Sequence, residues 1–289
     1  MTAQKAQSTP LEKARELQRK LYRAAKAQPQ RTFGVLFDKV CSLEVLWFAW
    51  EQVRRNRGAA GVDGETIESI EARGALWFLL ELREELLQQR YRPQPVRRVF
   101  IPKPDGRQRP LGIPGVKDRV AQAAVKIVIE PLFEASFRPG SYGFRPKRSA
   151  KQAIYDIRKW VTYGYDKVID LDLKSYFDTI DHEILMKLVQ RRVRDPRVLR
   201  LIRLWLKAGV MHEGIREETV VGSPQGGSDL AVVVQHLFAP ARSVLGAGGE
   251  GDEDGALCGR PGCAVPMEAP GDIHAEAEAV PGAAAGDCQ

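Results

Sequence analysis

Hydrophobic residues recur at helical intervals through the first half of the chain, and the residue types at the ends of these runs predict where helices start and stop. Thr9-Pro10-Leu11-Glu12 combines a hydroxyl cap, a proline at the first helical position and a glutamate that closes a capping box. Ser42 is expected to begin a second helix, with Gly58 as its left-handed stop. The spacing predicts a third helix over 67–90. Its core candidates are Leu76, Leu79, Leu80, Leu86 and Leu87.

The same signals continue in the second half of the chain. Val116–Phe137 has a helical pattern, which Pro131 is expected to kink or end. Ser149 is a cap candidate for a helix with one apolar side. Further amphipathic helices are predicted from about Asp181 and over 195–209. The expected apolar side of the helix after Ser149 consists of Ala153, Ile154, Ile157 and Val161.

Two segments alternate with the two-residue period of a strand. Residues 96–114 contain β-branched residues, a Pro104-Asp105-Gly106 turn and interleaved cations, which predicts a hairpin with a cationic face. Residues 167–173 place apolar and acidic side chains on opposite faces of a strand. Strands among helices predict an α/β or α+β body. Beyond Leu245 the chain is mostly Gly, Ala, Pro, Asp and Glu, so a disordered tail is expected.

The charge of the chain is unevenly distributed. The last 49 residues carry two basic and nine acidic side chains, which leaves 42 basic and 28 acidic residues in the first 240. This basic body suggests a polyanionic partner such as a nucleic acid, and a solvated basic surface is the alternative. No apolar run reaches the length of a transmembrane helix, and the N-terminus has no signal-peptide core, so a soluble cytoplasmic protein is expected.

Carboxylates and cysteines are the candidate metal ligands. Asp170 and Asp172 share a strand face at roughly 7 Å along the backbone. Two buried carboxylates would repel each other unless a cation lay nearby, and hard divalent ions such as magnesium prefer carboxylate oxygen. A cap or an ion pair with a nearby lysine is the alternative for this pair. Cys258 and Cys263 with His274 resemble a zinc site only weakly, because no second ligand pair accompanies them.

The predicted hairpin supplies positive charge. Lys103 and Arg109 flank its turn, and a lysine with an arginine fork suits a triphosphate or a nucleic-acid backbone, although a solvated turn would look similar. Paired glycines in the segment 222–227 allow a ligand to approach the backbone, and Gln225 offers a donor and an acceptor. The other nearby cations are Arg97, Arg98 and Arg107.

Four motifs in series resemble those of the reverse transcriptases encoded by group II introns. They are FIPKPDGRQRPLGIPGVKDRV, SYGFRPKRSA, VIDLDLKSYFDTIDH and GSPQGG, and a GAAGVDG turn precedes them. The resemblance covers about residues 33–227. It implies an α+β, right-hand polymerase-like fold with fingers and a partial palm, followed by the disordered tail.

The resemblance also assigns residues to the chemistry of RNA-directed DNA synthesis. Asp172 matches the metal-binding aspartate, and the backbone carbonyl of Leu173 would be a further ligand of magnesium. Phe177 matches the aromatic residue that excludes a ribose 2′-hydroxyl. Asp170 matches a strand residue that does not bind metal in the family, so Asp172 alone is expected to be the carboxylate ligand.

The remaining assignments concern the incoming nucleotide. Lys103 and Arg109 match the fingers residues that hold its triphosphate, and Gln225 matches a glutamine that packs beside it. The implied partners are deoxynucleoside triphosphates, group II intron RNA and an RNA template with a DNA primer, with no membrane.

The motif positions imply four segments. Residues 1–32 would be an N-terminal helical extension, 33–165 the fingers and 166–227 the partial palm. Residues 228–289 do not resemble the family and are expected to be a disordered tail.

The sequence departs from the family pattern after GSPQGG, because the 289 residues contain no Tyr-Ala-Asp-Asp. Without its carboxylates, two close divalent cations would lack ligands, so this chain is expected to be inactive. A frameshift near Gly227 is our hypothesis for the departure. Back-translation of residues 229–237, read one base later, gives Ile-Ser-Pro-Leu-Leu-Ser-Asn-Ile, which resembles the family's next helix; a chance match is the alternative. Two other hypotheses are a catalytically dead RNA-binding fragment and an unrelated magnesium nuclease.

Overall fold

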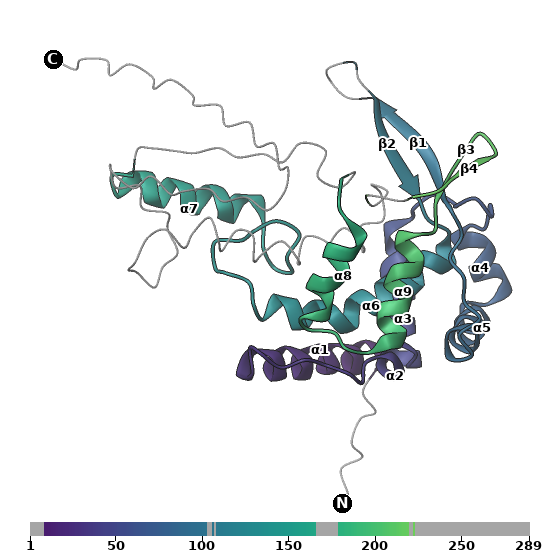
Figure 1. Ribbon diagram of the computed structural model, residues 1–289, viewed down its shortest axis with the longest axis horizontal. Helices are drawn as coiled ribbons and strands as arrows, with labels where there is room; N and C mark the ends of the chain where they lie inside the picture. Colours follow the sequence, from purple (N-terminus) through teal and green to yellow (C-terminus); the bar gives the residue numbers. More distant parts are fainter. Residues whose placement is uncertain (1–8, 103–105, 107, 166–178, 220–221, 223–289) are drawn as a thin grey trace, which may run out of the picture.

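The structure is a computed structural model that describes residues 9–102, 106, 108–165, 179–219 and 222. Within these ranges, a packed body of helices carries a small sheet along one side, and one helix, α7, lies apart from the body (Figure 1). The helices are α1 (Pro10–Ala27), α2 (Phe37–Val40), α3 (Leu43–Asn56), α4 (Ile67–Arg73), α5 (Ala75–Leu87), α6 (Val116–Glu134), α7 (Ala150–Thr162), α8 (His182–Gln190) and α9 (Pro196–Leu206). The strands are β1 (Val96–Pro102), β2 (Gln108–Ile113), β3 (Val210–His212) and β4 (Ile215–Glu217).

The predicted helix starts are confirmed by their caps. Thr9 and Glu12 form the capping box of α1, with a proline at the first helical position. Ser42 caps α3, Asp181 caps α8 and Asp195 caps α9, each through a side-chain oxygen that accepts a backbone N–H. Such local hydrogen bonds satisfy the orphan donors of the first turn, and they need no tertiary structure to form.

Two predicted helix boundaries are wrong. The helix expected over 67–90 is two helices, because Gly74 has φ 103°, which no helix accommodates. The left-handed residue after α3 is Arg57, with φ 44°, and not the expected Gly58.

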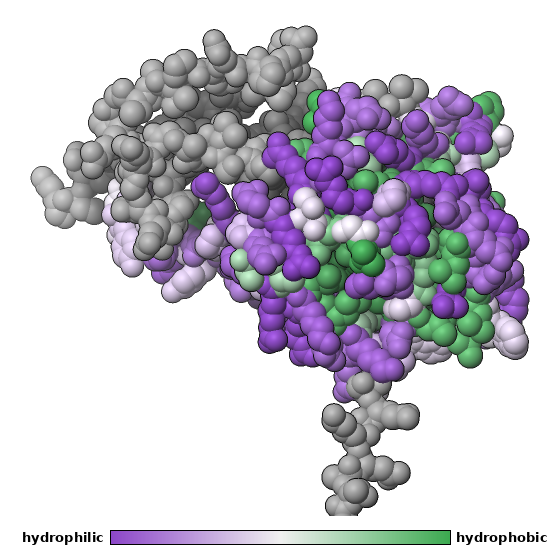
Figure 2. Space-filling model, turned by 60° about the horizontal axis from the view of Figure 1, so that its bottom comes forward, coloured by the Kyte–Doolittle hydropathy of each residue, from purple (hydrophilic) through white to green (hydrophobic). Residues whose placement is uncertain are grey.

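The five predicted core candidates all lie within α5, and they differ in burial. Leu79 and Leu86 are buried as expected, whereas Leu76 and Leu87 are exposed. Exposed apolar side chains are visible as green atoms among hydrophilic ones on the face shown in Figure 2.

The core is built around α6. Its middle carries consecutive buried residues from Val120 to Val125, and α1 and α3 pack against it. Pro131 lies inside the helix, which ends three residues later, so the expectation that proline would end it holds approximately. A helix that is apolar on nearly all sides is stable only when other elements surround it, and this explains its central position.

The sheet has the order β2-β1-β3-β4. The expected hairpin is confirmed as the antiparallel pair β1–β2, with Ile101 opposite Arg109. Strand β3 pairs in parallel with the start of β1, where Val96 lies opposite Val210, and β4 turns back along β3. Strands β3 and β4 were not predicted from the sequence, because three residues each are too few to show a two-residue period.

Helix α7 forms where it was predicted, with a capping box between Ser149 and Gln152. It contains no buried residue, and Ile154, Ile157 and Val161 are 53–65% exposed. The predicted apolar side therefore exists as a pattern without being part of the core.

The mixed helix and strand composition confirms the expected α+β character. The strand predicted over 167–173 and the tail lie outside the described residues. Among the helices that the structure describes, none is both long and apolar enough to cross a membrane.

Candidate nucleotide-binding hairpin

The β1–β2 hairpin projects from the helical body (Figure 1). The exposure of its residues increases toward the tip. Val96 at its base is buried, whereas Phe100 and Ile101 are 44% and 46% exposed. Arg109 is exposed on β2, directly opposite Ile101. Arg109 therefore belongs to the exposed part of the hairpin.

The turn of the hairpin is described only at Gly106. Its φ of 80° lies in the left-handed region, where glycine carries no steric penalty. This position agrees with the turn that was predicted from Pro104-Asp105-Gly106. Lys103, the other predicted triphosphate ligand, lies outside the described residues.

Arg97 has a different role from the one its sequence position suggests. Its Nε and Nη2 both donate to the carbonyl oxygen of Ala60, at 3.0 and 2.8 Å. Arg119 on α6 donates from Nη2 to the carbonyl oxygen of Ala59 at 2.7 Å. Two arginines thus hold the start of the GAAGVDG loop, one from the hairpin and one from α6. This arrangement was not predicted from the sequence, because nothing in the chain marks which carbonyls an arginine will reach.

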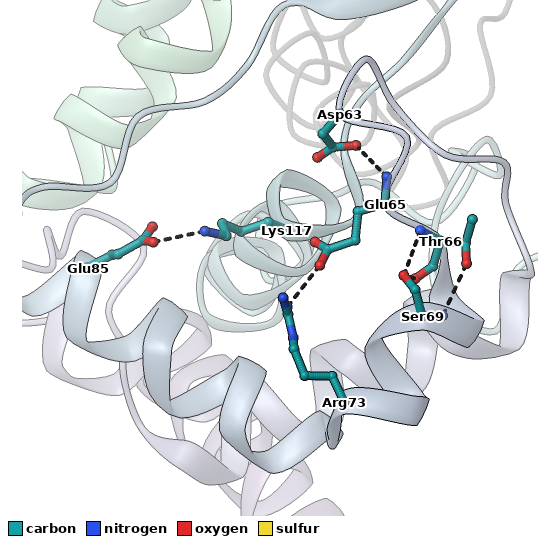
Figure 3. A network of polar contacts seen from close by, with 7 residues as sticks. All are labelled: Asp63, Glu65, Thr66, Ser69, Arg73, Glu85 and Lys117. Carbon is teal, nitrogen blue, oxygen red and sulfur yellow. Dashed lines mark hydrogen bonds and ion pairs between the residues drawn. The ribbon is translucent and has the colours of Figure 1, made fainter.

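The rest of that loop is held by short polar contacts (Figure 3). An Asp63 oxygen accepts the backbone N–H of Glu65 at 3.1 Å, and the Glu65 carboxylate pairs with Arg73 at 2.8 Å. A second ion pair, 2.8 Å long, joins Lys117 at the start of α6 to Glu85 on α5. In Figure 3 these contacts lie around Lys117, at the N-terminal end of α6. The bonds from Arg97 to the Ala60 carbonyl join the loop to the hairpin. The box between Thr66 and Ser69 caps α4.

A buried polar cluster lies beneath this region. The Tyr91 hydroxyl donates to Asp118 Oδ1 at 2.5 Å and accepts the indole N–H of Trp205 at 2.9 Å. Asp118 also accepts the backbone N–H of Gln94 at 3.1 Å. The pKa of Asp118 is raised to about 6, mainly by burial and in smaller part by the charge of Asp63, while the hydrogen bonds from Tyr91 and Gln94 oppose the rise. This cluster joins α6 to α9 and was not predicted from the sequence.

Of the predicted site residues, the structure describes Arg109. The others, which include every predicted magnesium ligand, lie outside the described residues, so none of them is placed relative to Arg109. Within the described ranges, no three His, Cys, Asp or Glu side chains are grouped as a metal site would require. The residues outside are Lys103, Asp172, Leu173, Phe177 and Gln225, together with Asp170 and the tail residues Cys258, Cys263 and His274.

Comparison with known proteins assigns the class of the domain. Residues 101–243 match the family described as reverse transcriptase (RNA-dependent DNA polymerase). This match begins on β1, one residue after Phe100, and includes Arg109 and α6 to α9. The chain therefore contains a reverse-transcriptase domain.

Individual proteins that the chain is similar to are as follows. Protein YkfC of Escherichia coli (strain K12) is 41% identical over 218 residues, which are 73% of this chain and 57% of YkfC. The group II intron-encoded protein LtrA of Lactococcus lactis subsp. cremoris is 33% identical over 198 residues, which are 68% of this chain and 32% of LtrA. A chain of the structure titled "Partial Cas6-RT-Cas1--Cas2 complex" is 21% identical with a TM-score of 0.48, and the match covers 74% of this chain and 35% of that chain.

Residues 101–243 match the reverse-transcriptase family, and the chain is similar to group II intron-encoded proteins, as its motifs predicted. It spans little more than half of YkfC and about a third of LtrA.

Proposed function

We propose that this chain forms the fingers and part of the palm of a group II intron reverse transcriptase. The fingers would be residues 33–165, which include the projecting hairpin, and the partial palm residues 166–227. Residues 1–32 would be the helical extension, whose helix α1 packs on α3 and α6. Residues 228–289 would be the tail.

The hairpin would hold the triphosphate of an incoming deoxynucleotide through Arg109 and Lys103. The observation that carries this proposal is the exposed position of Arg109 on a projecting hairpin inside the segment that matches the reverse-transcriptase family. A planar guanidinium can donate two parallel hydrogen bonds to a phosphate, and Lys103 would add a point charge. The hydrogen bonds from Arg97 and Arg119 to the Ala60 and Ala59 carbonyls would hold the base of the hairpin in place while its tip binds the nucleotide.

The metal and base contacts follow the family motifs. Asp172 and the carbonyl of Leu173 would hold magnesium, which supplies charge neutralisation at the phosphates when bound. Phe177 would exclude a ribose hydroxyl, and Gln225 would pack beside the nucleotide. The support for these four residues is the motif sequence alone.

We further propose that these 289 residues bind nucleic acid without extending a primer, because they contain no Tyr-Ala-Asp-Asp. Their partners would be group II intron RNA and an RNA template with a DNA primer. A catalytically dead RNA-binding fragment is the second candidate function. It is favoured by the basic body, with 42 basic and 28 acidic residues in the first 240.

Primer extension tests this proposal. The 289-residue chain is incubated with an RNA template, a labelled DNA primer, deoxynucleotides and magnesium, and the products are separated by length. We expect an unextended primer together with retention of the template in a filter-binding assay. Extension would contradict the proposed inactivity, and loss of RNA binding would contradict both candidate functions.

Substitution of Arg109 tests the hairpin separately. The binding of a fluorescent deoxynucleoside triphosphate with magnesium is measured for the wild type, Arg109→Ala and the control Arg55→Ala on α3. Hydrogen bonds to charged groups contribute roughly 1.5–3 kcal/mol, so Arg109→Ala should weaken binding about tenfold to a hundredfold. Equal affinities of the three proteins would contradict the role of Arg109.

A further inference from the structure

Helix α9 carries a polar face made only of cations. Arg197, Arg200, Arg203 and Lys207 recur at intervals of three or four residues, so they lie along one side of the helix and its C-cap. We call these four residues the α9 cationic ridge. No acidic residue occurs between Pro196 and Leu206, so the helix itself offers no carboxylate to neutralise the ridge.

The opposite face of α9 is part of the core. Six of its apolar residues are at most 7% exposed. An amphipathic helix that binds a membrane must release its apolar face to the lipid, and this face is not available. The ridge is therefore the side of α9 that a partner can reach. The buried residues are Val198, Leu199, Leu201, Ile202, Trp205 and Leu206.

The cations of the ridge have little compensation nearby. The described contacts include no ion pair of Arg203 or Lys207 with a carboxylate. Arg197 lies 3.6 Å from Asp195 Oδ1. That carboxylate already accepts backbone N–H groups from Leu36, Phe37 and Arg197 itself. The ridge thus keeps most of its positive charge.

Arg92 is a further cation beside the ridge, because it and Arg200 donate to the same carbonyl oxygen, that of Gln89. Gln89 has φ 56°, a conformation that is uncommon for a residue other than glycine. Its backbone carbonyl accepts from Arg92 Nη1 at 2.9 Å and from Arg200 Nη2 at 3.4 Å. The side-chain oxygen of Gln89 accepts a second bond from Arg200 at 2.8 Å. Two guanidinium groups therefore meet at one carbonyl oxygen, an arrangement that a bound anion would stabilise.

We propose that the α9 cationic ridge, together with Arg92, binds the phosphate backbone of RNA. This inference rests on the proposed function and adds a surface to it. From Arg197 to Lys207 the ridge is about 15 Å long at 1.5 Å per residue. That length corresponds to roughly four phosphates along one strand of a duplex. Because the ridge would contact phosphates and not base edges, its binding to RNA would be independent of base sequence.

The ridge leads toward the hairpin. Helix α9 is followed after a short turn by β3, and Val210 of β3 lies opposite Val96 at the base of β1 (Figure 1). An RNA strand that lies along the ridge would therefore approach the strand pair that carries Arg109. A protein partner is less consistent with the ridge, because protein interfaces have apolar centres with few charges.

Neutralising two ridge residues tests this surface. Arg203→Gln/Lys207→Gln removes two exposed charges whose described contacts include no ion pair. Lys13→Gln/Lys20→Gln is the matched control, since it removes the same charge from α1, where both lysines pair with glutamates at 3.3 and 2.7 Å. Binding of a fluorescein-labelled RNA of about 30 nucleotides to the full chain is measured from about 50 to 200 mM KCl, the range over which phosphate contacts weaken. Thermal unfolding verifies that each variant is folded.

We expect the ridge variant to bind about tenfold more weakly at about 100 mM KCl. Its plot of log affinity against log salt should be shallower by roughly 1.5, since each lost phosphate contact removes about 0.7–0.9 from the slope. The control should keep the wild-type slope. A ridge variant with wild-type affinity and slope overturns the inference while the proposed function stands. A wild type that does not bind RNA overturns both, and a preference for anionic phosphatidylserine vesicles over RNA would assign the ridge to a membrane surface instead.

Discussion

Helices α6 and α7 have similar sequence signals and lie in opposite environments. Both were predicted from helical spacing, and α7 has the stronger start, with a capping box that α6 lacks. Yet α6 is buried along most of its length, whereas α7 contains no buried residue. Local hydrogen bonds and spacing determine whether a segment is helical, and burial depends on which elements meet it. The hairpin tip shares the exposure of α7, and it is where the proposed nucleotide contacts lie.

Buried charged side chains strengthen the contrast, because those that the structure describes, Asp118, Arg192 and Asp195, all lie in the body. The Arg192 guanidinium, 6% exposed as a residue, donates to the carbonyl oxygens of Leu132 and Ala25 at 3.0 and 3.2 Å. Burial lowers the pKa of this group, and the carbonyls at two helix ends offset part of the lost hydration. The Asp195 carboxylate likewise joins α9 to the start of α2, by accepting the backbone N–H groups of Leu36 and Phe37. Such residues make the body sensitive to substitution in a way that the hairpin and α7 are not.

The largest effect is expected for Asp195→Ala. The carboxylate caps α9 and accepts the N–H groups of Leu36 and Phe37, both at 2.9 Å. Its loss removes a cap worth about 1 kcal/mol and leaves buried donors unsatisfied at about 1–3 kcal/mol each. We expect a loss of about 3–5 kcal/mol in the free energy of unfolding, measured in urea. Asp195→Asn, which keeps an acceptor oxygen, should lose less, and equal stability of alanine and wild type would contradict this role.

A matched pair of substitutions compares the two helices directly. Leu132 in α6 is fully buried and Ile157 in α7 is 60% exposed. Leu132→Ala should cost about 2–5 kcal/mol, as cavity-forming substitutions do. Ile157→Ala should change stability by less than about 0.5 kcal/mol. Urea midpoints of the two variants measure the difference, and a similar loss in both would show that α7 is packed.

The stability of the body should also depend on pH through Asp118. Its pKa is raised from 3.8 to about 6, so the folded state binds the proton more tightly than the unfolded state does. This contribution is complete below pH 3.8 and is lost as the pH rises through 6. It amounts to about 3 kcal/mol at about 1.36 kcal/mol per pKa unit. As the pH rises from about 4 to 7, the free energy of unfolding of the wild type should fall relative to that of Asp118→Asn. Parallel pH profiles of the two proteins would contradict the raised pKa of Asp118.

The smallest expected effect is an increase in stability. Arg57 is exposed and occupies the left-handed position that ends α3. Replacing it with glycine removes the steric cost of the side chain at φ 44°. Arg57→Gly should raise stability by about 0.5–1 kcal/mol, whereas Arg55→Gly, inside the helix, should lower it by a similar amount. A melting temperature that falls in both variants would argue against the strained cap.

The sequence was most informative where structure is local. Ser149, Asp181 and Asp195 were all found as caps, and the hairpin was found from its turn and alternation. The break at Gly74 was missed because a lone glycine is tolerated in many helices. The short strands β3 and β4 were missed because they depend on pairing with β1 and with each other.

The candidate site shows the same division. Arg109 was identified from a motif and is exposed on the hairpin as expected, and the family was identified from four motifs in series. By sequence, Arg97 looked equivalent to Arg109, yet its guanidinium donates to the Ala60 carbonyl. The partner of an arginine is decided by backbone that lies near it only after folding, so charge patterns alone could not separate the two. The roles of Lys103, Asp172, Leu173, Phe177 and Gln225 stay predictions.

The central claim is that the basic body of this chain binds nucleic-acid phosphates, and the salt dependence of RNA binding tests it most directly. The affinity of the 289-residue chain for RNA should fall linearly on a log–log plot between about 50 and 200 mM KCl. With about six or more phosphate contacts, the loss should be about a thousandfold. An affinity that does not change over this range would contradict the claim.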